Sequence, residues 1–422
     1  MLLEGRAMSR PAPALLTAVC CALAACAPTT DEATSVVVLA YQPELERYDR
    51  HVVQLHTIDD IVALKGSVAE VIGGAELDFD AATIDGLVGN AGSGVKADFI
   101  DVDGVLVPTD FHSLNMVTAY YNLERSALFF EGLGLNLIDY GQKTLYYFPS
   151  VTMFGEEAKD NAFFSAALNG FAVLPFDEFQ TLPLAINLGI MGHEFTHSVF
   201  NYYVCDADPF CPLSDPTFTS NEAANVITSL DEGIADFMGA AIVCGESFDT
   251  CDPNFMAPSM PSAYASTRNL SRRRCISDGM EEMLRGDVNV FYNEGYAYIL
   301  GTVLASSLWR AVEELGGTRD AWQQIIGGVI NALGGDSSSG LRGLGQQELA
   351  SGKQGVAIKE YADHLTLESA LDAIAEQMSG NAKKVVCESF LDRFALTTRD
   401  LPECANYESA GECSSRSFGG AP

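Results

Sequence analysis

Apolar residues recur every three or four positions in several long stretches of the chain, and this spacing predicts amphipathic helices. The clearest stripe consists of Leu188, Met191, Phe195, Val199 and Tyr202. The predicted helical ranges are 113–131, 184–203, 221–243, 296–315, 366–378 and 387–394. Ser113 stands at the start of the first range and is its predicted N-cap.

Shorter apolar and aromatic runs predict β-strands. Thr144–Phe148 has the composition of a strand, and Asn161–Pro175 predicts two strands joined by a turn at Asn169-Gly170. Residues 35–110 combine β-rich pieces with acidic, glycine-containing loops. The Gly- and Ser-rich range 334–355 predicts a loop. The strands are therefore expected in the first half of the chain.

Composition narrows the class of protein. The chain has 422 residues, of which 48% are apolar and 19% charged, so it can bury a sizeable core. This excludes disorder, a collagen-like repeat and a coiled coil as the main architecture. Acidic residues outnumber basic ones by 57 to 24, giving a net charge of −33. Such a surface repels phosphate backbones, so no nucleic-acid partner is expected. It suits a secreted, calcium-binding or salt-adapted protein, or solubility alone.

The start of the chain has the features of an export signal. Arg6 and Arg10 precede an apolar run over residues 11–25 that is too short to cross a bilayer as a helix. The run ends in LAAC, which resembles a bacterial lipobox, where cleavage precedes a cysteine that is then acylated. Residues 1–25 are therefore the predicted signal peptide, Cys26 the predicted lipid carrier and 26–34 a tether. An ordinary signal peptide followed by a chance cysteine is the alternative.

Export would place the protein at a membrane through its lipid alone. Residue 27 is Ala rather than Asp, and by resemblance to bacterial lipoproteins this favours the outer membrane or cell surface, facing the periplasm or the exterior. We recognise no transmembrane span after the signal and no internal repeat. Nothing in the sequence sets an oligomeric state.

The cysteine count agrees with export. Eleven cysteines are present, and eight remain once Cys20, Cys21 and Cys26 are set aside. An even number in an exported chain indicates up to four disulfides. Proximity along the chain suggests the pairs Cys205/Cys211, Cys244/Cys251 and Cys404/Cys413, with Cys275/Cys387 as the remainder. Eight cysteines allow about 105 connectivities, so other pairings stay open.

The strongest chemical motif is His193-Glu194-Phe195-Thr196-His197, an HExxH sequence. Side chains four residues apart share a helix face, so both imidazoles can bind one metal ion. Zinc binds imidazole nitrogens at about 2.0–2.1 Å, a geometry that a rigid helix can hold. Glu194 would then act as general base on a metal-bound water. The alternative is a helix whose two histidines make ordinary hydrogen bonds.

A second motif supplies carboxylates for the same ion. In the sequence LDEGIAD, Glu232 and Asp236 are four positions apart on one helical face. Glu232 would be the third zinc ligand, and Asp236 would hold a ligating histidine by its distal N–H. A solvated acidic face is the alternative, but the apolar, Ala- and Gly-rich surroundings argue against it.

Together, HEFTH and DEGIADFMG resemble the thermolysin and fungalysin group of gluzincin metallopeptidases, which carry HExxH on one helix and ExxxD on a later one. The resemblance covers about residues 113–315 and includes Ala119–Phe130 and Asp160–Phe164. It implies an α+β fold, a zincin-type two-lobed metallopeptidase with a β-rich N-terminal lobe and a mainly helical C-terminal lobe. It also implies that Asn161 and the backbone of Ala162 pair with a peptide or protein substrate.

The resemblance implies a division of the chain. Residues 111–204 would form the catalytic β/α lobe with the HExxH helix, 205–220 a disulfide-pinned insertion, and 221–422 a helical lobe with the third ligand. Residues 35–110 would be an inhibitory pro-segment, a folding aid or a permanent domain. The group often binds Ca²⁺ as well. Acidic clusters at 206–215 and 249–252 are candidates, with solvated loops as the alternative because neither matches an EF-hand.

One departure from the family concerns the histidine that stabilises the oxyanion. The corresponding range 287–295 (DVNVFYNEG) contains no histidine. Tyr292 is the candidate donor in its place, with Tyr202 and Tyr203 as further candidates, and losing such a donor costs about 10²–10³ in rate. Two functions are therefore weighed: a surface-anchored zinc endopeptidase, or a zinc-binding lipoprotein without turnover that serves as a peptide-binding or structural module.

Overall fold

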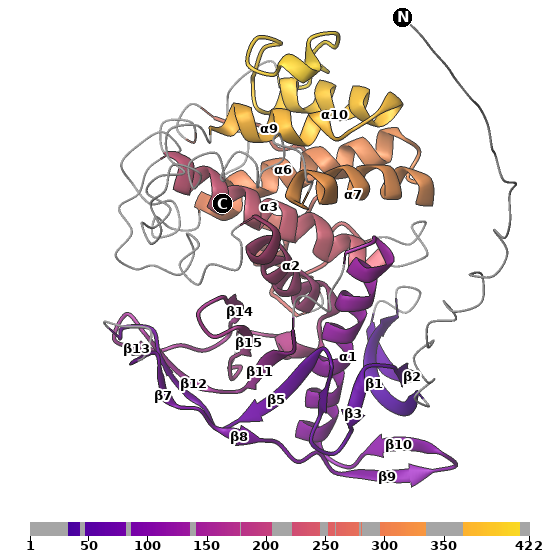
Figure 1. Cartoon of the computed structure of the whole chain (residues 1–422), viewed down its shortest axis with the longest axis vertical. Coiled ribbons are helices and arrows are strands. Elements are labelled where there is room, and N and C mark those ends of the chain that lie inside the picture. The colour runs from indigo at the N-terminus through magenta and orange to yellow at the C-terminus, as the bar shows by residue number, and fades with distance from the viewer. Residues whose placement is uncertain are drawn as a thin grey trace, which may run out of the picture. The chain divides into compact units, whose positions relative to one another are not determined.

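A computed structural model describes residues 33–42, 47–81, 86–135, 141–177, 179–204, 222–244, 252–257, 259–277, 280, 296–334 and 366–413 (Figure 1). All the described elements belong to one compact unit that begins at Thr34. The predictions for the signal peptide, Cys26, the insertion at 205–220 and Tyr292 lie outside the described residues, as does nearly all of the predicted loop at 334–355.

The largest sheet has seven strands. Its order is β14 (Ala162–Ser165), β15 (Gly170–Val173), β11 (Lys143–Tyr147), β5 (Ala69–Gly73), β4 (Lys65–Gly66) and β3 (Ile58–Asp60), with β8 (Ser93–Gly94) paired to β5. β11 runs parallel to both β5 and β15, whereas β14 is antiparallel to β15 at the edge. The predicted turn before β15 is confirmed, since Asn169 has a φ of 47°, a conformation that Asn tolerates better than most residues.

Two four-stranded sheets complete the β part. One has the order β2 (Arg47–Leu55), β1 (Thr34–Gln42), β10 (Val105–Pro108) and β9 (Phe99–Val102). The other has the order β13 (Glu156–Glu157), β12 (Ser150–Met153), β6 (Glu76–Asp78) and β7 (Val88–Asn90). The range 35–110 is thus rich in strands, as predicted. It also supplies β5, which lies inside the sheet that carries β14.

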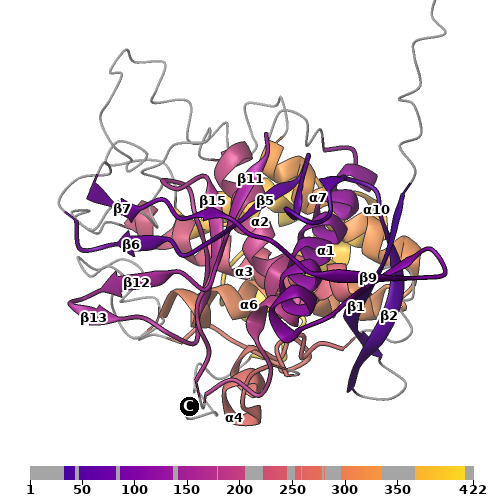
Figure 2. The ribbon, with the colours of Figure 1, turned by 90° about the horizontal axis from the view of Figure 1, so that it is seen from below.

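Helices dominate the second half of the chain. The long ones are α1 (Phe111–Gly132), α2 (Leu188–Val204), α3 (Glu222–Cys244), α6 (Tyr296–Glu314), α7 (Arg319–Gly334), α9 (Leu367–Glu376) and α10 (Gly380–Arg393). The short ones are η4 (Leu184–Ile186), α4 (Ser262–Ala265), η6 (Ser266–Arg268) and η8 (Pro402–Cys404). In Figure 1, α2 lies between the sheets and the later helices, and Figure 2 shows strands of the large sheet crossing α1 and α2. The fold is α+β, as predicted.

The starts of two helices are set by capping side chains. Asp110, not Ser113, caps α1: its carboxylate accepts from the backbone N–H of Ser113 at 3.0 Å, and the Ser113 hydroxyl donates back to it. The predicted N-cap is therefore wrong, because the aspartate three residues earlier reaches the free N–H groups. Asn187 separates η4 from α2 by accepting from the N–H of Gly189 at 2.9 Å.

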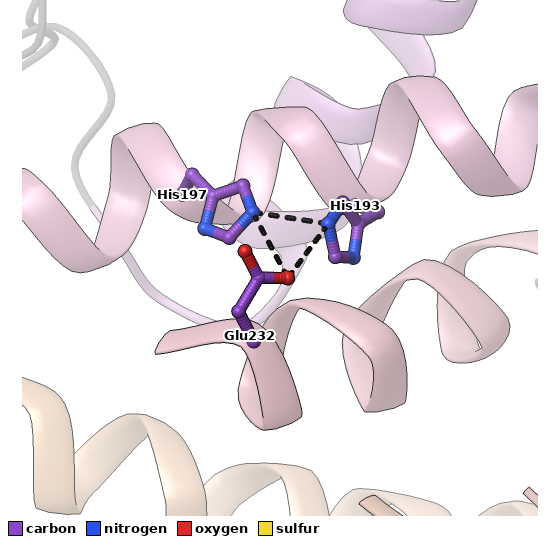
Figure 3. A group of neighbouring side chains, drawn as sticks. All are labelled: His193, His197 and Glu232. Atoms are coloured by element: carbon purple, nitrogen blue, oxygen red, sulfur yellow. Dashed lines mark hydrogen bonds and ion pairs between the residues drawn. The ribbon is translucent and has the colours of Figure 1, made fainter. Parts of the chain in front are cut away.

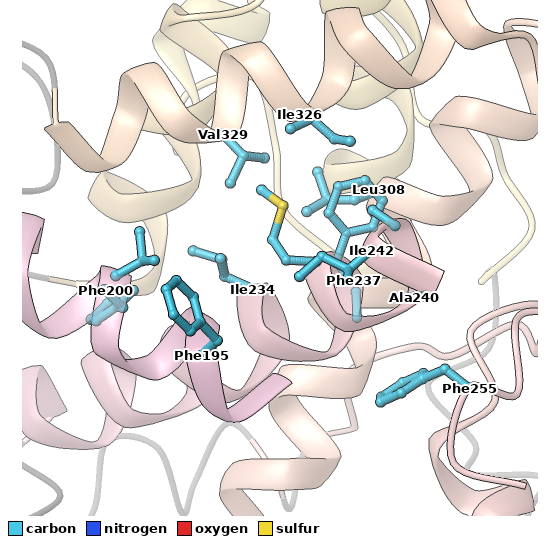
Figure 4. Packing of buried hydrophobic residues seen from close by; sticks show 14 of the residues in the cluster. Phe195, Phe200, Ile234, Phe237, Ala240, Ile242, Phe255, Leu308, Ile326 and Val329 are labelled. Atoms are coloured by element: carbon cyan, nitrogen blue, oxygen red, sulfur yellow. The ribbon is translucent and has the colours of Figure 1, made fainter. Parts of the chain in front are cut away.

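The core joins these elements through aromatic and aliphatic packing. Phe195 of α2 stacks between Phe130 of α1 and Phe171 of β15, with ring centroids 5.9 and 5.8 Å away. Figure 4 shows the same ring near Ile234 of α3, below the side chains of α6 and α7. The stripe predicted from the sequence therefore faces the core. Among the described helices, none has the length and hydrophobicity needed to cross a bilayer.

The disulfides differ from those that sequence proximity suggested. Cys275 is bonded to Cys413 and Cys387 to Cys404, so the predicted pairs Cys404/Cys413 and Cys275/Cys387 are wrong. η8 folds back on α10, which brings Cys404 to Cys387, and the chain beyond it reaches the loop at Cys275. Loop-closure entropy grows slowly with length, so nearness in sequence constrains pairing weakly. Cys244 is also disulfide-bonded, whereas Cys205, Cys211 and Cys251 lie outside the described residues.

Candidate metal centre

Three side chains converge in the core, as Figure 3 shows: His193, His197 and Glu232, which together are called the metal group. The Nε2 atoms of the two histidines are 3.0 Å apart. The Oε2 atom of Glu232 lies 3.5 Å from Nε2 of His193 and 3.9 Å from Nε2 of His197. All three residues are buried, and one ligand atom from each lies within 4.8 Å of the others. The HExxH and ExxxD motifs therefore meet as predicted, with α2 presenting both imidazoles to α3.

Close packing of α2 on α3 makes this convergence possible. A Cβ added to Gly239 of α3 would lie 2.7 Å from the carbonyl oxygen of Gly189 and 3.2 Å from the Cβ of His193. Real Cβ atoms are not found at the shorter distance, so only glycine allows the two helices to approach this closely at the first histidine. Gly239, the last residue of DEGIADFMG, thus has a packing role beside His193.

Each histidine has a carboxylate at its distal nitrogen. Nδ1 of His193 is 3.1 Å from Oδ1 of Asp236, and Nδ1 of His197 is 2.8 Å from Oδ1 of Asp231. Carboxylates in this position orient metal-binding imidazoles and raise their basicity. The sequence predicted this contact for Asp236. The sequence analysis did not single out Asp231, although this residue directly precedes Glu232 on α3.

Glu194 is held next to the group by the edge strand. Its Oε2 accepts the backbone N–H of Phe164 at 2.9 Å, and its Oε1 lies 3.9 Å from Nε2 of His193. Burial first, and then the nearby carboxylate of Glu232, raise the pKa of Glu194 to about 8. A carboxylate with such a pKa can take up and release a proton near neutral pH.

Arg268 contacts the metal group, and the sequence did not predict this contact. Its Nε donates to Oδ2 of Asp236 at 3.1 Å, its Nη2 pairs with the other oxygen of Asp236, and Nη2 is 3.3 Å from Oε2 of Glu232. The same Nη2 is 3.4 Å from Nε2 of His193. Burial alone would raise the pKa of Asp236, but the positive charge of this guanidinium outweighs burial and holds that pKa below its usual range. Arg268 lies at the end of η6, where no repeating pattern marks it.

The two imidazoles have opposite proton affinities. Burial and the positive charge of Arg268 lower the pKa of His193 to about 3. Burial also acts against a charge on His197, but the carboxylates of Asp231 and Glu232 outweigh it and raise the pKa of His197 to about 10. Burial raises the pKa of Glu232 to about 7. At neutral pH the group therefore holds at least one proton that a metal ion would replace.

The donor set fits a divalent metal ion. Two imidazole nitrogens and one carboxylate oxygen are the ligands found in catalytic zinc sites, which keep a fourth position open. The buried carboxylates behind both rings supply the supporting contacts that such sites use. The group can thus hold a metal ion. Among the described residues no other such group of His, Cys, Asp and Glu is found, and the acidic cluster at 206–215 lies outside them.

The remaining predicted site residues lie on or near the edge strand. Asn161 precedes β14; its backbone carbonyl accepts from the N–H of Leu174 at 2.8 Å, and its side chain accepts from the N–H of Ala162 at 3.0 Å. Phe164, the partner of Glu194, is two residues further along the strand. The outer edge of β14 is therefore next to the metal group, although the roles predicted for Asn161 and Ala162 stay predictions.

No protein-family model and no curated protein matches this sequence. Among solved structures, the chain is similar to the precursor of protealysin, a metalloproteinase from Serratia proteamaculans, with a TM-score of 0.44 and 14% sequence identity. The match covers 80% of this chain and 91% of the protealysin chain. A likeness this distant adds no weight to the site, which stands on its own geometry.

Proposed function

We propose that the protein is a zinc-dependent endopeptidase. The observation that supports this most directly is the buried group of His193, His197 and Glu232, with Glu194 held beside it by the N–H of Phe164. Three protein ligands, an open position and an adjacent carboxylate form the arrangement that metal-assisted hydrolysis requires.

The chain's own residues would handle the proton. A bound zinc ion would supply a Lewis acid toward the peptide carbonyl and lower the pKa of water. Glu194 would accept a proton from the attacking water and deliver it to the leaving amine. Its raised pKa, about 8, suits both tasks, and the N–H of Phe164 holds one carboxylate oxygen while the other faces the metal group.

The substrate would lie along the edge of the large sheet. Among the described strands, β14 pairs with β15 alone. An extended peptide can therefore add to its other side as a strand, with the side chain of Asn161 and the backbone of Ala162 as partners. We also propose that the chain is exported and carries a lipid at Cys26, which mass analysis of the mature N-terminus would test.

The decisive experiment compares the wild type with Glu194→Gln, and uses Glu131→Gln on the exposed face of α1 as a matched control. Metal content and cleavage of unfolded casein are measured on the same preparations. We expect about one zinc per chain in all three proteins and cleavage by the wild type and the control only. A Glu194→Gln protein that still cleaves would contradict the role of this residue. A metal-loaded wild type that cleaves nothing would favour a binding module without turnover.

A further inference from the structure

The ring of Tyr298 faces Arg268, the arginine that contacts the metal group. The Cζ of Arg268 lies 4.6 Å from the ring centroid of Tyr298, which is within the range of a cation–π contact. The same guanidinium reaches Glu232, a predicted metal ligand, at 3.3 Å. Arg268 thus contacts both the ring of Tyr298 and that predicted ligand.

The crossing of α6 over α3 positions this tyrosine. Gly301 of α6 packs so closely on α3 that a Cβ added there would lie 3.0 Å from the Cβ of Glu232. Tyr298 is three positions before Gly301, and residues at this spacing share a helix face. The face of α6 that carries Tyr298 is therefore the one that meets the metal group.

The hydroxyl of Tyr298 is available to a ligand. His193, His197 and Glu232 are at most 7% exposed, whereas Tyr298 is half-buried. Its backbone carbonyl accepts from Thr302, but no hydrogen bond from its hydroxyl to another described residue is present. The nearby carboxylate of Glu232, and then burial, raise the pKa of Tyr298 well above its usual range, so its hydroxyl carries a proton at neutral pH. Within the described part of the chain, the side chain therefore offers a hydrogen-bond donor that has no partner.

We propose that Tyr298 donates a hydrogen bond to the scissile carbonyl oxygen as that oxygen becomes negative. This inference rests on the proposed peptidase function. The water oxygen bonds to the carbonyl carbon, the π electrons of C=O move onto oxygen, and Glu194 accepts the water proton. When the C–N bond breaks, C=O reforms, the nitrogen leaves with the proton from Glu194, and an acid and an amine result. Tyr298 keeps its proton throughout.

The test is Tyr298→Phe, which removes the hydroxyl and keeps the ring over Arg268. We expect kcat on unfolded casein to fall about 10²–10³-fold, with KM, zinc content and Tm unchanged. Tyr264→Phe is the matched control, because Tyr264 is another phenol within the electrostatic reach of Arg268 and is expected to behave as the wild type.

A second readout does not depend on turnover. Calorimetry on zinc-loaded protein compares a phosphonamidate peptide, whose phosphoryl oxygens imitate the charged oxygen, with a thiol peptide of the same sequence that only binds the metal. Because transition-state analogues report the contacts made in that state, Tyr298→Phe should weaken only the phosphonamidate, by about 10²-fold.

Each other outcome overturns the proposal in a distinguishable way. Wild-type kcat and phosphonamidate affinity in Tyr298→Phe would exclude the hydroxyl and leave the peptidase function in place. Loss of zinc or a lower Tm in that variant would make Tyr298 a support for Arg268 rather than a donor. A wild type without metal or cleavage would remove the peptidase function, and this inference with it.

Discussion

Asp231 is expected to position the second histidine. Its carboxylate lies 2.8 Å from Nδ1 of His197, and both residues are buried. Because a carboxylate at this nitrogen fixes the ring and raises its basicity, Asp231→Ala should weaken metal binding about 10–100-fold. Competition with a chelator measures the affinity, and Asp59→Ala at an exposed site serves as the control. Equal affinities in the two variants would argue against the positioning role.

Metal binding is expected to compete with protons. Asp231 and Glu232 keep His197 protonated at neutral pH, with a pKa of about 10 despite its burial. Since the metal ion replaces that proton, its apparent affinity should rise about tenfold per pH unit for each proton released, between about pH 6 and pH 8. Calorimetry in buffers of different ionisation enthalpy counts the protons. Affinity that is constant over this range would show that His197 is already neutral.

The convergence of the candidate ligands could be predicted from sequence, whereas Arg268 could not. HExxH and ExxxD are local patterns, in which a spacing of four places both side chains on one helix face. Arg268 meets Glu232 and Asp236 across 36 and 32 positions of chain, from a short helical turn without periodicity. Only the folded chain brings these charges together. The same holds for Tyr298, whose place depends on how two helices cross.

At the scale of elements, α3 and α6 cross so closely that we expect no side chain to be tolerated at Gly301 of α6. A Cβ added to Gly301 would lie 2.7 Å from the backbone N of Gly233 and 3.0 Å from Cβ of Glu232. Gly301→Ala should therefore destabilise the protein by about 1–3 kcal/mol and weaken metal binding, because the helix that carries Glu232, the predicted third ligand, must shift. Thermal unfolding and chelator competition measure the two effects.

Gly327 of α7 provides the control of opposite sign. A Cβ added there has no neighbour within 4 Å, so Gly327→Ala should stabilise the protein by about 0.5–1 kcal/mol through the lower entropy of the unfolded chain. If both alanine variants had the same stability, the close crossing would not be what limits Gly301.

Helices were predicted where regular apolar spacing was uninterrupted, and were missed or shortened where glycines or polar residues interrupted it. The ranges of α2, α3 and α6 match their predictions to within a few residues. α7 was not predicted: two adjacent glycines, Gly327 and Gly328, interrupt its middle and lower its helix propensity. α10 begins at Gly380, seven residues before the predicted start, because its first turns carry polar residues such as Lys383 and Lys384.

At the scale of the whole molecule, residues 34–110 are expected to be needed for folding. They supply β5, which is hydrogen-bonded to β11 over five residue pairs in the middle of the large sheet. A chain of residues 111–422 would expose that edge, and we expect it to be unfolded or aggregated. Circular dichroism and gel filtration compare it with residues 33–422, which retain every described element. A soluble, folded 111–422 fragment would show that the segment is dispensable.

The bond between Cys275 and Cys413 links the chain's last described residue to the loop that follows Arg268, the last residue of η6. Within that loop the guanidinium of Arg274 donates to the carbonyl of Thr267 at 2.7 Å, so the tether reaches the residue next to the metal-group arginine. Production in a host that keeps thiols reduced would prevent this disulfide from forming, and the loop would lose its covalent link to Cys413. We expect such material to retain its helices yet to bind a metal ion poorly, so the expression compartment would affect any test of the proposed hydrolysis.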